Sequence, residues 1–172
     1  MYYVGLSWYV LDLFDSGLAL GILMMFATLP GVIFGPFSGV LVDRVNRKKL
    51  IIIMDFVRGI IILVLTQLLL LDRLLYLNLL IGTFLMSICS TIFNPAISAL
   101  ISNLVDDENL SKANSLENLS RNLTGILGAA LGGLLLGFYG VAGIFFLNGI
   151  SFLLSAILEI YIQMSVLVDK NK

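Results

Sequence analysis

The sequence predicts an all-α integral membrane protein, a bundle of six helices, and two observations support this. The first is composition: 59% of the 172 residues are hydrophobic, 12% are charged, and the mean hydropathy is +1.05. A water-soluble domain of this size needs many more charged residues to cover its surface. The second is that the apolar residues gather in long runs separated by very short polar connections. Residues 1–172 are therefore expected to form a single transmembrane unit.

A membrane-spanning helix needs about 20 mostly apolar residues. Five runs reach that length and the first does not. The predicted spans are residues 1–14, 18–42, 50–71, 74–104, 113–139 and 141–168. Residues 1–14 would rise only about 21 Å as a helix. We therefore expect the first helix to be truncated.

Composition also excludes several functions. Histidine is absent and Cys89 is the only cysteine, so an internal disulfide, a Cys/His zinc site and a histidine-activated nucleophile are ruled out. We expect no metal, no cofactor and no enzymatic activity. The net charge of −1 lacks the basic surplus with which nucleic-acid binders neutralise phosphates. The expected surroundings are a lipid bilayer.

Basic residues in short loops predict the orientation in the membrane, because they stay on the cytoplasmic side. With six spans, one side of the membrane would hold only Arg73, and the other would hold Arg44, Arg47, Lys48, Lys49, Lys112, Lys170 and Lys172. This asymmetry predicts a multi-pass protein of the cell membrane with its basic loops in the cytoplasm.

Glycines at intervals of four residues occur in two of the predicted helices. Gly31, Gly35 and Gly39 lie in the second, and Gly128, Gly132, Gly133 and Gly137 form two such pairs in the fifth. Such stripes allow helices to approach closely, and generic packing explains any one pair. The two helices are the middle members of consecutive triplets, which is the pattern of two inverted three-helix repeats.

The connection between the second and third spans concentrates charge. Five charged residues fall within seven consecutive positions: Asp43, Arg44, Arg47, Lys48 and Lys49. A charge run of this kind is most often a solvated turn.

Six further charged residues lie inside predicted spans, where ionisable groups are costly and tend to be paired. Two of them, Asp12 and Glu159, are unpaired in the sequence. Asp55 and Arg58 are spaced i,i+3, and Glu117 and Arg121 are spaced i,i+4, so each pair can form a salt bridge on its own helix. Arg58 and Glu117 are long enough to reach the interface instead, whereas Asp55 is short and favours a paired role.

The charged loop carries a resemblance to a known family. Residues 39–50, GVLVDRVNRKKL, resemble the signature G-x-L-x-D-R-x-G-R-(R/K) between helices two and three of the major facilitator superfamily. The segments LPGVIFGPFSG, MDFVRG, NPAISALISNLV, LSKANSL and LGAALGG are similar to its drug-exporter branch, which includes macrolide efflux proteins. The resemblance covers essentially the whole chain and matches the N-terminal six helices of a twelve-helix transporter, half of a major facilitator fold.

The resemblance implies a secondary transporter that works by alternating access, usually driven by protons, with a small-molecule substrate held between two six-helix halves. It implies that Gly39, Asp43, Arg44, Arg47 and Lys48 form a latch that stabilises the outward-open state. It places Asp55 and Arg58 in an extension of that network. The second half would be a C-terminal half or a second copy of the chain.

Two positions depart from the family pattern. Asn46 stands where the family has glycine, which we expect to be tolerated because asparagine accepts a left-handed conformation. Ala129 stands where the antiporter motif G-P-x-x-G-G of helix five has proline, so Gly128, Gly132 and Gly133 are left as a helix-packing motif. This weakens the case for strict antiport.

These observations lead to three hypotheses about function. The first is proton-driven efflux of small amphipathic compounds such as drugs. The second is a truncated, transport-inactive fragment of such a transporter, which the short first helix favours. The third, an intramembrane enzyme, is the weakest, because neither a histidine nor a G-x-G-D motif is present.

Overall fold

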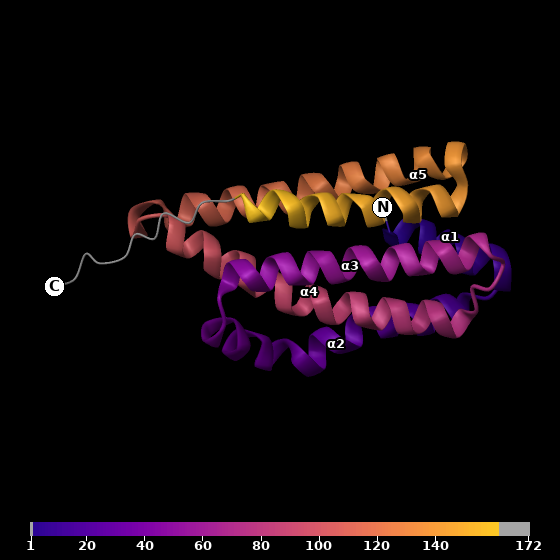
Figure 1. The fold of residues 1–172 in the computed structure, drawn as a ribbon, viewed down its shortest axis with the longest axis horizontal. Coiled ribbons are helices and arrows are strands. Elements are labelled where there is room, and N and C mark those ends of the chain that lie inside the picture. Colours follow the sequence, from indigo (N-terminus) through magenta and orange to yellow (C-terminus); the bar gives the residue numbers. More distant parts are fainter. Residues whose placement is uncertain (1, 162–172) are drawn as a thin grey trace.

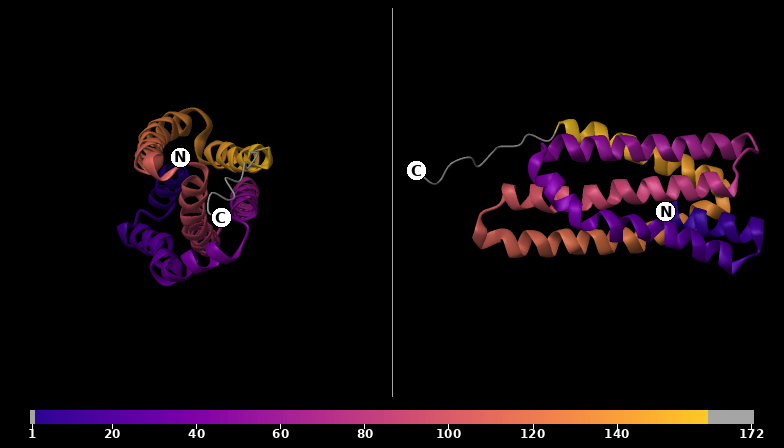
Figure 2. Two further views of the ribbon diagram at one scale, coloured as in Figure 1. Left: turned by 90° about the vertical axis from the view of Figure 1, so that its left-hand side faces the viewer. Right: turned by 90° about the horizontal axis from the view of Figure 1, so that it is seen from below.

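The computed structural model describes residues 2–161, apart from the side chains at positions 103, 104 and 107, and that range is helical between short connections (Figure 1). The end of the predicted last span, with Lys170 and Lys172, lies outside the described residues. The helices are α1 (Tyr2–Phe14), α2 (Gly17–Arg44), α3 (Arg47–Leu70), α4 (Tyr76–Leu104) and α5 (Asp107–Ile160). They lie roughly along one axis, side by side, as both views of Figure 2 show.

Helix α5 consists of two limbs that meet at Gly140, where the chain reverses (Figure 1). Gly140 has φ 64° and ψ −172°, a conformation that is essentially restricted to glycine. A Cβ atom at the nearby Gly143 would overlap the side chain of Tyr139. The first limb is residues 107–139 and the second is residues 141–160. The reversal falls at the residue that separates two of the predicted spans.

Gly140→Ala is expected to lower the free energy of unfolding by about 2 kcal/mol, because alanine pays a backbone penalty in this conformation. The thermal unfolding midpoint of the purified chain in detergent measures the effect. Gly125→Ala is the matched control, because Gly125 is helical and a Cβ there would meet nothing within 4 Å. Equal midpoints for the two variants would contradict the role of Gly140.

Four helices are long and apolar enough to cross a membrane by length and composition: α2, α3, the Tyr76–Ser102 part of α4, and the Glu108–Ile160 part of α5, which contains the reversal. Helix α1 has 13 residues. Helices α2 and α4 continue through Pro30, Pro36 and Pro95, and α2 bends visibly (Figure 1). The Ser87 hydroxyl on α4 donates to the Ala27 carbonyl of α2 at 2.6 Å.

A close helix contact joins α3 to the second limb of α5. A Cβ atom at Gly59 would lie 2.6 Å from Leu153 Cδ2 and 3.2 Å from the Gly149 carbonyl oxygen, and one at Gly149 would lie 2.9 Å from Leu63. Only residues without a side chain permit this approach. The two helices are therefore held in a fixed register along this contact.

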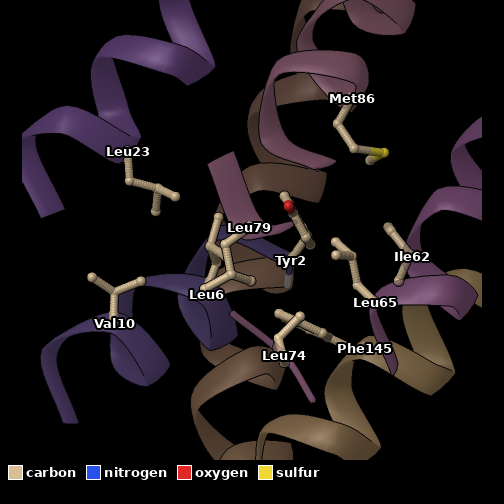
Figure 3. Close-up of a cluster of buried hydrophobic side chains, with 10 residues drawn as sticks. All are labelled: Tyr2, Leu6, Val10, Leu23, Ile62, Leu65, Leu74, Leu79, Met86 and Phe145. Carbon is tan, nitrogen blue, oxygen red and sulfur yellow. The ribbon is translucent and has the colours of Figure 1, made fainter. Parts of the chain in front are cut away.

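Two hydrophobic clusters fill the bundle. The larger one draws residues from all five helices and packs Phe145 of α5 against Tyr2 of α1, with ring centroids 5.5 Å apart (Figure 3). The smaller one lies beneath the connection between α2 and α3 and consists of Val42, Leu50, Ile51, Ala96 and Leu100. The second cluster fixes the base of the charged loop.

The predicted glycine stripes do not coincide with close packing within the described bundle. A Cβ atom at Gly35, Gly39, Gly133 or Gly137 would meet nothing within 4 Å, and one at Gly31 would only touch Thr91. Gly132 is buried and Gly128 is half-buried. The close approach occurs instead at Gly59 and Gly149, which the sequence pattern did not single out.

Candidate functional site

The charged loop is shaped by a helix cap. Arg44 ends α2, Val45 is extended, and Asn46 is the N-cap of α3, where its side chain accepts a hydrogen bond from the Lys49 backbone amide at 3.1 Å. Asn46 has φ −62°, so the expected left-handed turn is wrong. Asparagine is among the best N-cap residues, and that role explains its presence.

Arg47 connects this loop to α4. Its Nη2 atom lies 3.3 Å from Asp43 Oδ1, and its Nη1 atom donates to the Ala99 carbonyl at 3.2 Å. The Asp43 side chain is nevertheless 73% exposed. Asp43 is thus held in place by Arg47 and still presents its carboxylate outward.

The other residues assigned to the latch are placed differently. Lys48 donates to the Ile160 carbonyl at the end of α5 at 2.7 Å, and a cation there suits the negative end of the helix dipole. Arg44 is exposed and makes no hydrogen bond or ion pair with the described part of the chain, and Gly39 faces open space.

Asp55 and Arg58 form a buried ion pair on α3. Arg58 Nη1 lies 2.9 Å from Asp55 Oδ1, and the two side chains are 7% and 4% exposed, respectively. The guanidinium also lies over the Phe93 ring of α4, 4.3 Å from its centroid, and near Phe152 of α5. The pair therefore sits where α3, α4 and the second limb of α5 meet.

Glu159, which the sequence left unpaired, is the third member of this cluster. It is buried on the second limb of α5, receives a hydrogen bond from Ser155 Oγ at 3.3 Å, and interacts with both Asp55 and Arg58. No local spacing connects it with residues about a hundred positions earlier. Its only sequence signal was a carboxylate within an apolar run.

Glu117 and Arg121 form the second predicted ion pair, on the first limb of α5. Arg121 also donates from Nη1 to Asn94 Oδ1 of α4 at 2.9 Å, and Ser98 Oγ donates to Glu117 at 3.2 Å. These contacts bridge α5 to α4 beside Pro95. They line an open groove of about 510 Å³ formed by Asn94, Pro95, Ser98, Asn114, Glu117, Asn118 and Arg121.

The charged residues form three separate groups. The resemblance implied that Asp55 and Arg58 extend the network of the loop, but Arg58 is eleven residues beyond Arg47, about 16 Å along α3. Within the described residues, no hydrogen bond or ion pair joins the buried pair to Asp43 or to the Glu117–Arg121 pair. The two ion pairs within the bundle touch neighbouring positions of α4, Phe93 and Asn94. They lie at a similar depth on different faces of that helix.

The chain is similar to one known protein family along almost its whole length. The profile described as Major Facilitator Superfamily matches residues 1–169. The chain belongs to the Major Facilitator Superfamily. Within residues 2–161, no cluster of histidine, cysteine, aspartate and glutamate side chains is arranged to hold a metal ion.

Curated relatives of this superfamily member are transporters. It is 28% identical over 159 residues to the uncharacterized MFS-type transporter YfiS of Bacillus subtilis (92% of this chain and 37% of YfiS), and 37% identical over 131 residues to BacE of the same species, assigned as a bacilysin exporter (73% and 31%). It is 26% identical over 167 residues to macrolide efflux protein A of Streptococcus pyogenes (97% and 41%).

The superfamily member described here spans between about a third and two fifths of the length of these relatives. No solved structure matches it significantly. Family membership and the apolar helices together identify a multi-pass membrane protein of a superfamily of transporters. The helical architecture agrees with the fold class expected from composition.

Proposed function

We propose that this chain is the N-terminal half of a secondary exporter, a six-helix bundle of two inverted three-helix repeats that expels small amphipathic compounds by alternating access driven by protons. Both limbs of α5 count as separate helices in this arrangement. The names of two relatives, a bacilysin exporter and a macrolide efflux protein, support an exporter. The basic loop between α2 and α3 lies in the cytoplasm in this proposal.

The observation that carries the proposal is the position of Asp43. Its carboxylate is held by Arg47, which is itself anchored to the Ala99 carbonyl, yet it remains 73% exposed. An anchored and exposed carboxylate at the end of a bundle is suited to contact the N-terminus of a helix from another bundle. Such a contact contributes about 1 to 2 kcal/mol in a partly buried setting, which shifts a two-state equilibrium about tenfold.

Exposed apolar side chains supply a surface for the second half. On α2 they include Leu18, Val32 and Phe37, and on the first limb of α5 they include Ile126 and Phe138. Some of this surface is covered by lipid, and the rest is available to a second bundle. The groove near Asn94 and Arg121 lies at the same end of the bundle as the charged loop. Its lining includes α4 residues 94–98, and Arg47 of the loop donates to the Ala99 carbonyl of the same helix.

Asp43→Asn in the complete transporter is expected to reduce efflux about tenfold, because the amide keeps the size of the side chain but loses the charge that the latch requires. Cellular accumulation of radiolabelled erythromycin, with and without a proton uncoupler, measures the effect at matched protein levels. Asp72→Asn is the control, since Asp72 is an exposed turn residue in a different connection. Efflux unchanged by Asp43→Asn would contradict the latch.

The alternative of a transport-inactive bundle is tested by expressing the chain alone and together with a second six-helix half. Efflux that appears only in the second case supports the half-transporter. Efflux in neither case, with both proteins in the membrane, supports the inactive bundle.

A further inference from the structure

The buried cluster on α3 and α5 contains two acids and one base. Asp55 and Arg58 come from α3, and Glu159 comes from the second limb of α5. The other titratable groups near the cluster are Cys89 of α4 and Tyr3 of α1, which both interact with Arg58. None of these supplies a second positive charge. With both carboxyls ionised, the cluster would carry a net charge of −1 inside the bundle.

Two atoms of this cluster lack hydrogen-bond partners. Arg58 Nε and Glu159 Oε2 are both buried, and they are two of the three such side-chain atoms in the described part of the chain. Most buried polar groups in proteins are satisfied. The cluster therefore holds an unused donor on Arg58 and an unused carboxyl oxygen on Glu159.

An uncompensated charge is expensive in a membrane-embedded bundle, so such carboxyls are usually paired or protonated. One guanidinium can compensate only one of two neighbouring carboxylates. Asp55 occupies the ion pair with Arg58 at 2.9 Å, whereas Glu159 receives a hydrogen bond from the Ser155 hydroxyl, interacts with Asp55 and has no ion pair of its own with the guanidinium. The geometry favours Glu159 as the protonated carboxyl.

We propose that Glu159 is a proton-binding site, and that release of its proton draws the carboxylate toward Arg58 Nε and loosens the contact between α3 and the second limb of α5. The step converts a carboxylic acid into a carboxylate and transfers one proton to water, so the cluster changes from neutral to −1. The hydrogen bond from Lys48 to the Ile160 carbonyl lies at the adjacent end of α5, one residue beyond Glu159.

This inference rests on the proposed function in one respect only, that the bundle changes conformation in a proton gradient. The proton itself is tested without transport. Infrared difference spectra of the purified full chain are recorded at neutral and high pH, with side-chain carboxyls labelled with ¹³C in glutamate or in aspartate. The wild-type chain is expected to show the carbonyl band of a protonated carboxylic acid that shifts only with labelled glutamate.

Glu159→Gln is expected to abolish that band completely, because glutamine resembles the protonated side chain but cannot ionise. Glu117→Gln is the control, since Glu117 pairs with Arg121 in a separate group, and its band is expected to remain. A wild-type spectrum without the band, a band that shifts with labelled aspartate, or a band that persists in Glu159→Gln would overturn the proposal.

The conformational part is tested with a spin-label pair. In a Cys89→Ser background, cysteines replace the exposed residues Ile53 of α3 and Ile157 of α5, and the distance distribution between the labels is measured across the same pH change. The distance distribution is expected to shift with pH in the chain that keeps Glu159, and to stay unchanged in the Glu159→Gln variant. The same pH response in both proteins would show that Glu159 does not control the contact, even where transport itself is intact.

Discussion

Arg58→Gln is expected to lower the free energy of unfolding by about 3 to 5 kcal/mol, because removing one partner of a buried ion pair leaves an uncompensated charge. Asp55 would lose its only ion-pair partner among the described residues, beside the second buried carboxyl of Glu159. The glutamine also gives up the stacking of the guanidinium over Phe93, which is favourable in a desolvated setting. The thermal unfolding midpoint of the purified chain in detergent measures the combined effect.

Arg121→Gln is the matched control on a partly exposed pair, in which the arginine side chain is 40% exposed. Exposed ion pairs contribute little, about 0 to 1 kcal/mol, so its unfolding midpoint is expected to stay near that of the wild type. The double variant Asp55→Leu/Arg58→Leu is expected to recover much of the loss, because an apolar pair replaces the buried charges. Equal losses for Arg58→Gln and Arg121→Gln would contradict a special role for the buried pair.

The ion pairs illustrate which part of the site was predictable from the sequence. Spacings of three and four residues place Asp55 with Arg58 and Glu117 with Arg121 on one helix face, and both salt bridges form. Glu159 joins Asp55 through the packing of α5 against α3, and the sequence contains no spacing that predicts a contact of this range. Local pairing was accessible from the sequence and tertiary pairing was not.

The same distinction applies to the helices and their connections. Long apolar runs predict helices well, since each run must satisfy its own backbone hydrogen bonds in lipid. The reversal at Gly140 coincides with the boundary expected between residues 139 and 141. The left-handed turn expected at Asn46 is wrong because asparagine favours both left-handed turns and N-caps. Only the position of the first helical residue distinguishes these two roles.

Glycine packing was the least predictable feature. A spacing of four residues identified Gly133 and Gly137, which face open space in this chain, whereas Gly59 and Gly149 have no such spacing and lie in a close contact between two helices. A stripe requires several small residues on one helix, but a close approach requires only one on each of two helices. That condition depends on helix register, which no single helix encodes.

Gly59→Leu is expected to lower the free energy of unfolding by about 3 kcal/mol, the upper end of the usual cost of overpacking a buried contact. Part of the added side chain would meet Leu153, which can rotate, but the Gly149 carbonyl oxygen lies 3.2 Å from the new Cβ and belongs to the backbone. The second limb of α5 must therefore move away from α3. Such a movement would also separate Glu159 from Asp55 and Arg58.

Gly133→Leu separates steric cost from intrinsic helix propensity, because a Cβ atom at Gly133 would meet nothing within 4 Å. Leucine is a better helix former than glycine, so this control is expected to unfold at the same temperature as the wild type or slightly above it. In the Gly59→Leu chain, the glutamate carbonyl band in the infrared spectrum should weaken together with stability, since a separated Glu159 is hydrated and ionises. A loss of stability with an unchanged band would mean that the α3–α5 contact and the charged cluster are independent of one another.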